Sequence, residues 1–126
     1  MLPRDMAKIG LLLLNDGRWN NKQIVTEEWI LQSTKPSVPE SEFFDYGYQW
    51  WHRSKNNKQW WKEPQAASDE EHDMSLALGW GGQYIIIVKD LNLVVITTAS
   101  DYDNDKANSK IPMVIEEIIP AITNTG

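Results

Sequence analysis

Apolar side chains recur at helical spacing near the N-terminus of the chain. Met6, Ile9 and Leu13 lie three or four positions apart, so in a helix they share one face. The pattern stops at an Asn-Asp-Gly sequence, where Gly17 can adopt the left-handed conformation that follows many helices. The sequence therefore predicts a helix over residues 3–15.

A second, shorter helix is expected to begin after Thr26. The Thr26 side chain can cap the first turn, and Glu27 and Glu28 lie where the helix dipole favours negative charge. This helix should end before Pro36, because the residue before a proline disfavours helical geometry. Connections are expected on either side of it, over residues 19–25 and 34–45.

Four segments are predicted to be strands, and three of them are rich in β-branched or aromatic residues. They are residues 46–53, 74–78, 83–88 and 93–98. The last two are joined by a tight hairpin turn at residues 89–92. Within them, residues 85–87 and 94–96 are apolar without alternation, which indicates strands covered on both faces.

The remaining segments complete an α+β plan. Long polar stretches at residues 55–73 and 101–108 read as loops, and residues 112–119 read as an amphipathic C-terminal helix. We expect one domain, residues 1–126, with an antiparallel β-sheet of about three to four strands flanked by the N-terminal and C-terminal helices.

Composition narrows the possible partners. The formal charge is −6 and no basic stripe is present, which argues against nucleic acid. Cysteine is absent, so disulfides and thiolate metal sites are excluded. No apolar run approaches the roughly 20 residues needed to span a bilayer, and no signal peptide is evident. We therefore expect a cytoplasmic location if this is the full gene product.

Three stretches in order along the chain resemble the C-terminal part of the serine β-lactamase-like family. This family includes class C β-lactamases, penicillin-binding proteins, D-Ala-D-Ala peptidases and related esterases. The first stretch is LPRDMAKIG at residues 2–10, continuing as NDGRW at 15–19 and through 24–34. The second is YGYQWW at 46–51, and the third is GWGGQY at 79–84.

The resemblance implies a site at the third stretch. In the family a Ser-x-x-Lys supplies the nucleophile and base, and a third motif lies on a strand beside the serine. Trp80-Gly81-Gly82 fits one version of that motif and is expected to bind substrate, because glycines allow a carbonyl to approach the backbone. The backbone N–H of Gln83 would be one of two oxyanion-hole donors.

The chain departs from the family at the nucleophile, because no serine has a lysine three residues later. The Tyr-x-Asn sequence Tyr102-Asp103-Asn104 follows the hairpin, whereas the family places its own before the third motif. The resemblance therefore implies a serine-hydrolase fragment or degenerate paralogue that lacks its catalytic half and is inactive alone.

No cofactor is expected. His52 and His72 lack a spacing suited to a metal site, and the acidic run at residues 69–73 is most simply a solvated loop.

Two other classes of function remain open. The chain has seven tryptophans, among them the pairs Trp50–Trp51 and Trp60–Trp61, and such side chains could bind a glycan or peptidoglycan-like ligand. Alternatively, an exposed sheet edge could make the chain an assembly element. The expected partner is a second copy in a homodimer, or a complementary N-terminal hydrolase chain.

Overall fold

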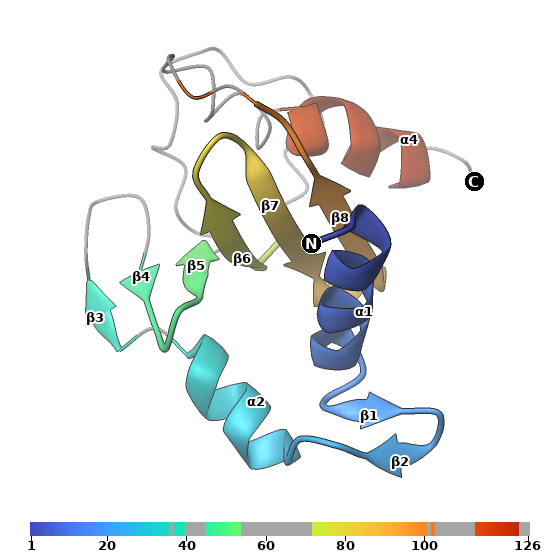
Figure 1. Cartoon of the computed structure of the whole chain (residues 1–126), viewed down its shortest axis with the longest axis vertical. Helices are drawn as coiled ribbons and strands as arrows, with labels where there is room; N and C mark the ends of the chain where they lie inside the picture. The colour runs from blue at the N-terminus through green and yellow to red at the C-terminus, as the bar shows by residue number, and fades with distance from the viewer. Residues whose placement is uncertain (36, 40–44, 54–71, 101, 103–112, 124–126) are drawn as a thin grey trace.

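The computed structural model describes residues 1–35, 37–39, 45–53, 72–100, 102 and 113–123 (Figure 1). Its first half holds α1 (Pro3–Leu14), β1 (Arg18–Trp19), β2 (Lys22–Gln23), α2 (Glu27–Thr34), β3 (Val38–Pro39), β4 (Asp45–Tyr46) and β5 (Trp51–Arg53). Its second half holds β6 (Met74–Gly79), β7 (Gln83–Val88), a 3-10 turn (Lys89–Leu91), β8 (Leu93–Thr97), a π-helical turn (Val114–Ile118) and α4 (Ile119–Thr123).

One antiparallel sheet organises the chain. Its strands follow sequence order from β3 to β8, and β1 and β2 form a separate two-stranded hairpin. The four longer strands, β5 to β8, make up most of the sheet, and β3 and β4 add two residues each. The predicted α+β class with an antiparallel sheet is confirmed.

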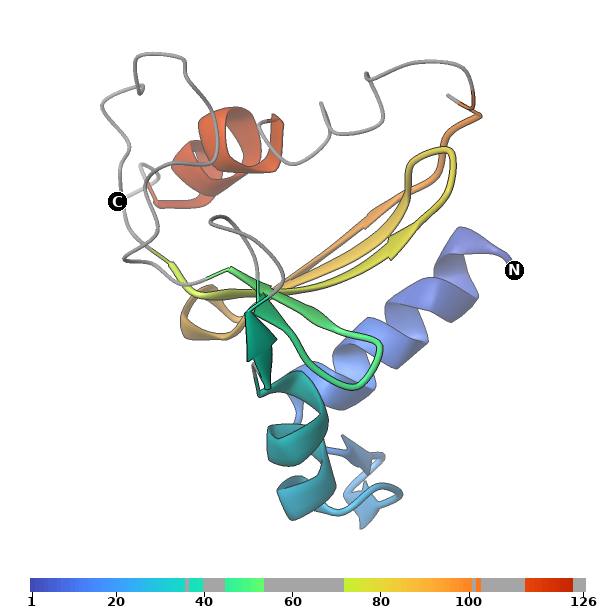
Figure 2. The same cartoon turned by 90° about the vertical axis from the view of Figure 1, so that its left-hand side faces the viewer.

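Helices cover the sheet on both faces, α1 on one and α4 on the other (Figure 2). Strand β7, which lies between β6 and β8, is buried along nearly its whole length. Ile85 and Ile87 pack on the α1 side, whereas Ile86 and Val88 pack on the side of the C-terminal helix. The prediction that the unbroken apolar run is covered on both faces is confirmed for β7.

The two N-terminal helices begin and end as the sequence predicts. Thr26 caps α2, with its Oγ1 accepting a hydrogen bond from the Trp29 backbone N–H at 3.2 Å. After α1, Asp16 and Gly17 both have positive φ, at 54° and 85°. Gly10 lies so close to β8 that a Cβ there would come within 2.5 Å of Val94 Cγ1.

The predicted strand over residues 46–53 is wrong, because the chain turns back within it. Gly47 donates a backbone hydrogen bond to the Trp50 carbonyl at 2.8 Å, and Gln49 takes a φ of 69°. The turn separates β4 from β5, which pair with each other. The aromatic residues correctly indicated β-structure, but they did not indicate the turn.

The connections predicted at residues 19–25 and 34–45 also contain short strands. In the first, Asn20 and Asn21 both have positive φ, as a two-residue hairpin turn requires. In the second, Val38–Pro39 pairs with β4. Most of residues 55–73 and 101–108 lie outside the described part of the chain.

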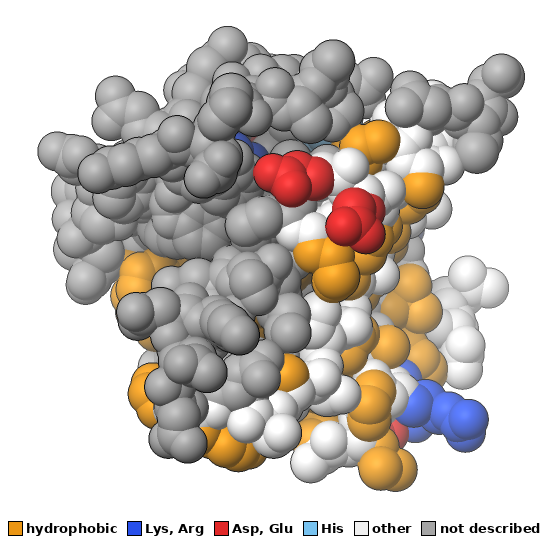
Figure 3. Space-filling model, turned by 90° about the horizontal axis from the view of Figure 1, so that it is seen from above, with side chains coloured by type: hydrophobic (Ala, Val, Ile, Leu, Met, Phe, Trp, Pro, Cys, Tyr) orange, Lys and Arg blue, Asp and Glu red, His pale blue; other side chains and the backbone are white. Residues whose placement is uncertain are grey.

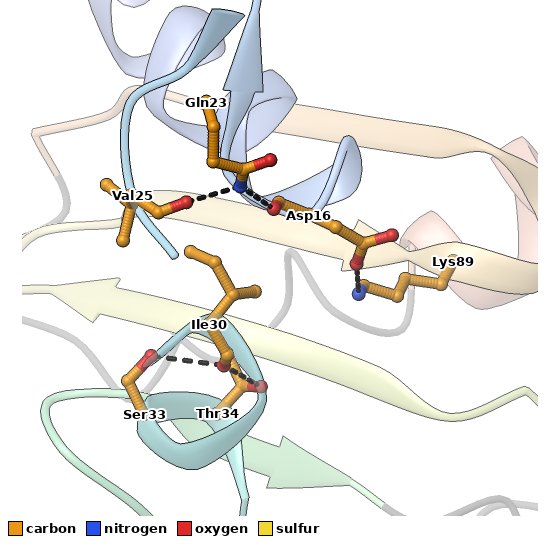
Figure 4. A network of polar contacts seen from close by, with 7 residues as sticks. All are labelled: Asp16, Gln23, Val25, Ile30, Ser33, Thr34 and Lys89. Atoms are coloured by element: carbon orange, nitrogen blue, oxygen red, sulfur yellow. Dashed lines mark hydrogen bonds and ion pairs between the residues drawn. The ribbon is translucent and has the colours of Figure 1, made fainter. Parts of the chain in front are cut away.

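Polar contacts fix the β1–β2 hairpin beneath α1 (Figure 4). The Gln23 side-chain amide donates to the Asp16 carbonyl at 2.8 Å and to the Val25 carbonyl at 2.5 Å. Lys89, at the turn between β7 and β8, forms an ion pair with Asp16 at 2.5 Å. The hairpin is thereby held to a segment more than 70 positions away in the chain.

The predicted C-terminal helix is present but irregular. A π-helical turn ends two residues before Pro120, and the Ile119 N–H donates to the Val114 carbonyl. A proline in a helix lacks an N–H and crowds the preceding turn, so a widened turn here has a direct steric cause. Among the described helices none is both long and apolar enough to cross a membrane.

Candidate functional site

The turn between β6 and β7 holds all four residues that the sequence singles out. Gly79 and Gln83 pair at its base, and Trp80, Gly81 and Gly82 form its tip. Both Gly81 and Gly82 are buried and have positive φ, at 83° and 97°. The glycines are therefore required by the backbone path, whatever else they do.

Two side-chain hydrogen bonds join this turn to β8 and to the segment that follows it. Thr97 Oγ1 donates to the Gly82 carbonyl at 2.9 Å, and the Gln83 side-chain amide donates to the Ala99 carbonyl. The Gln83 side chain thus has a structural role that the sequence did not indicate. Its backbone N–H lies at the first residue of β7, and its oxyanion-hole role stays a prediction.

Tyr102 lies against Gly81, a contact that the sequence analysis missed. A Cβ on Gly81 would come within 2.5 Å of Tyr102 Cε1, so only a glycine fits beneath this ring. The side chain of Tyr102 is half exposed. Tyr102 therefore belongs to the wall of the candidate site, although Asp103 and Asn104 lie outside the described residues.

Trp80 extends into solvent at the tip of the turn, with 77% of its surface exposed. So large an exposed fraction is unusual for a tryptophan in a folded chain. It does not pack over the sheet as a turn aromatic would. Its substrate-binding role stays a prediction, as do those of Gly81 and Gly82.

A second aromatic surface lies in the N-terminal half of the chain, between α2 and the β4–β5 turn. Trp29 on α2 stacks on Tyr48 in the β4–β5 turn, with ring centroids 5.6 Å apart and planes 23° apart. About half of each side chain is exposed, at 48% and 55%. Trp50 and Trp51 are only partly buried, and Trp60 and Trp61 lie outside the described residues.

Titratable side chains are dispersed in the described part of the chain. It contains no group of three or more His, Asp or Glu residues arranged to hold a metal ion. His52 lies on β5, whereas His72 is buried and its Nδ1 contacts the Asp90 carboxylate. Burial raises the pKa of the Tyr84 hydroxyl above its usual value, and this side chain faces the core beside α4.

The C-terminal helix adds acidic groups to the surface. Glu116 and Glu117 are exposed on the π-helical turn. Figure 3, which looks down on this end of the molecule, shows acidic and hydrophobic side chains interspersed over its described part. Most of the basic surface visible there lies at the lower right, and a small part lies beside one of the acidic groups.

A known structure shares this fold. The chain resembles the solved structure titled "Putative 6-aminohexanoate-dimer hydrolase from Bacillus anthracis", with a TM-score of 0.64 and 21% sequence identity. The match covers 97% of this chain but only 29% of that one, so the chain spans less than a third of its length. No protein-family model matches the chain, and no curated protein does.

Proposed function

We propose that the chain forms one wall of a β-lactamase-like serine-hydrolase site and contributes no nucleophile of its own. One observation carries the proposal: almost the whole chain shares the fold of under a third of a larger protein described as a hydrolase. The Trp80-Gly81-Gly82 turn would bind substrate. The Gln83 N–H would stabilise the oxyanion formed when an ester or amide carbonyl is attacked.

The chain alone should be catalytically silent, because it contains no Ser-x-x-Lys. We propose that the nucleophile comes from a complementary N-terminal hydrolase chain. Treating the purified chain with a fluorescent penicillin and a fluorophosphonate, followed by intact-mass measurement, should give no adduct. A stoichiometric adduct on a serine would show that the chain has its own nucleophile.

The wall itself can be tested by complementation. The remainder of the Bacillus protein, outside the matched part, would be co-expressed with this chain and its labelling by fluorophosphonate measured. Labelling should rise on the order of 100-fold or more when the chain is present. Equal labelling with and without the chain would contradict the proposal.

Two substitutions at one position separate the backbone donor from the side chain. Gln83→Pro removes the N–H, and proline is tolerated at the first residue of a strand. Gln83→Ala keeps the N–H and loses only the side-chain bond to Ala99. We expect labelling to be lost in Gln83→Pro and largely kept in Gln83→Ala.

A second candidate function rests on the Trp29–Tyr48 stack. The chain would then be a binding module for a glycan or peptidoglycan-like ligand, because the outer faces of exposed aromatic rings stack on apolar sugar faces. Titration with muropeptides should change tryptophan fluorescence and Trp29→Ala should remove the change. Leu31→Ala, which alters an exposed residue on the same helix, serves as the control. A response that survives Trp29→Ala would place the ligand elsewhere.

A further inference from the structure

The two edges of the six-stranded sheet differ in how they are protected. The β3 edge is two residues long and contains Pro39, which cannot donate to an added strand. The other edge, β8, is five residues long and consists of Leu93, Val94, Val95, Ile96 and Thr97. It contains no charge, proline or bulge, the features that natural sheets use to prevent edge pairing.

We propose that the free edge of β8 pairs antiparallel with β8 of a second copy of this chain. This inference goes beyond the proposed function and does not depend on it. No strand in the described part of the chain pairs with that edge, which forms the end of the sheet (Figure 1). Its unpaired N–H and C=O groups form the recognition surface.

Burial along β8 fits an edge that awaits a neighbour. All five residues are only partly buried, whereas the five residues Tyr84 to Val88 of the adjacent β7 are fully buried. Val94 and Ile96 pack toward α1, and Leu93 and Val95 pack toward the C-terminal helix. Because both faces already have cover, a strand added at the edge is what would complete their burial.

Exposed apolar side chains on α1 provide a second observation. Ile9 and Leu11 are 37% and 41% exposed, and the helix has leucines at four consecutive positions, Leu11 to Leu14. Four consecutive leucines run around a full turn, so a single sheet cannot bury them all. The face of α1 opposite the sheet carries the exposed Arg4 and Lys8, so the exposed apolar side chains lie on the flanks of the helix.

Pairing of two β8 strands would cover one flank of α1. Antiparallel strands in one sheet are related by a two-fold axis perpendicular to it, so both copies of α1 would lie on the same face. The close approach of Gly10 to both Ile85 and Val94 places α1 over β7 and β8. The two helices would therefore lie on either side of the new seam, each with one apolar flank toward it.

The register and the uncharged side chains of β8 favour a second copy as the occupant. A register centred on Val95 pairs all five residues, setting Val94 opposite Ile96 and Leu93 opposite Thr97 of the partner strand. No like charges meet along it, even though each chain carries a net charge of −6. Such an interface is isologous and closed, so it stops at a dimer.

The absence of cysteine allows a direct test of this register. In Val95→Cys the two cysteines would lie opposite each other, with Cα atoms about 4.5–5.5 Å apart, within range for a disulfide. In Thr97→Cys they would be displaced by four residues, or about 13 Å along the strand, which is too far. Oxidation should cross-link the first variant and leave the second uncross-linked.

Sedimentation of the unmodified chain gives the second readout. We expect twice the chain mass of 14.6 kDa at high concentration, and a single chain mass for Val95→Lys. Val95→Lys could also disturb folding, so a further measurement uses the unmodified chain. Its amide exchange along β8 should slow as the protein concentration rises. A monomer at every concentration would overturn the proposal, as would a dimer whose β8 exchange is unchanged and in which Val95→Cys fails to cross-link.

Discussion

Gly81 shows how one residue can satisfy two demands at once. Its φ of 83° lies in the region that favours glycine, and its missing Cβ leaves room for the ring of Tyr102. The sequence predicted that small residues here admit a substrate. The structure adds that the Tyr102 side chain already occupies one side of Gly81.

These two demands can be separated by a double-mutant cycle. Gly81→Ala should destabilise the chain by about 1–2 kcal/mol through the backbone and by roughly 1–3 kcal/mol more through the clash with Tyr102. In a Tyr102→Ala background only the backbone cost should remain. Urea unfolding of the four proteins measures both terms. An equal cost in the two backgrounds would mean that the ring moves away freely.

At the scale of elements, the packing of α1 on β8 depends on a small residue in the helix. Gly10 costs helix propensity, yet it allows the helix to contact Val94 closely. On propensity alone, Gly10→Ala should stabilise the chain by up to about 1 kcal/mol. The close contact with Val94 instead predicts that Gly10→Ala destabilises the chain.

We expect Gly10→Ala to destabilise the chain by about 1–3 kcal/mol, because the added methyl group overpacks the contact with Val94. Combining it with Val94→Ala should recover part of this loss, since the smaller side chain makes room. Thermal or urea unfolding measures the effect. Stabilisation by Gly10→Ala alone would show that α1 can shift without cost.

At the scale of the whole molecule, net charge opposes the proposed pairing through β8. Two chains of charge −6 repel each other, although the β8 strand itself is neutral. Salt screens this repulsion, with a Debye length of about 30 Å at 0.01 M and about 10 Å at 0.1 M. The apolar contacts at the seam do not weaken as the salt concentration rises.

The dimer should therefore tighten as salt rises, by several-fold in its dissociation constant over that range. Sedimentation equilibrium at a series of sodium chloride concentrations measures this directly. An interface built on ion pairs between the copies would weaken under the same conditions. That result would point to a different surface from β8.

The sequence alone determined those parts of the fold that depend on neighbouring residues. The helical period of residues 3–15, the Thr26 cap and the apolar runs of β7 and β8 each express a local preference, and the structure contains all of them. The α+β class followed from their order. The sequence also located the glycine-rich turn whose binding and oxyanion roles remain proposals.

Only the tertiary structure decided which distant residues meet. Gly10 with Val94, Gly81 with Tyr102, and Trp29 with Tyr48 are contacts between separate elements. The sequence also gave no indication of the turn between β4 and β5. The aromatic residues there favour a strand, and the pairing of β4 with β5 and of β5 with β6 overrides that preference. Such contacts depend on how the sheet stacks its strands and helices, and no local pattern in the chain encodes that arrangement.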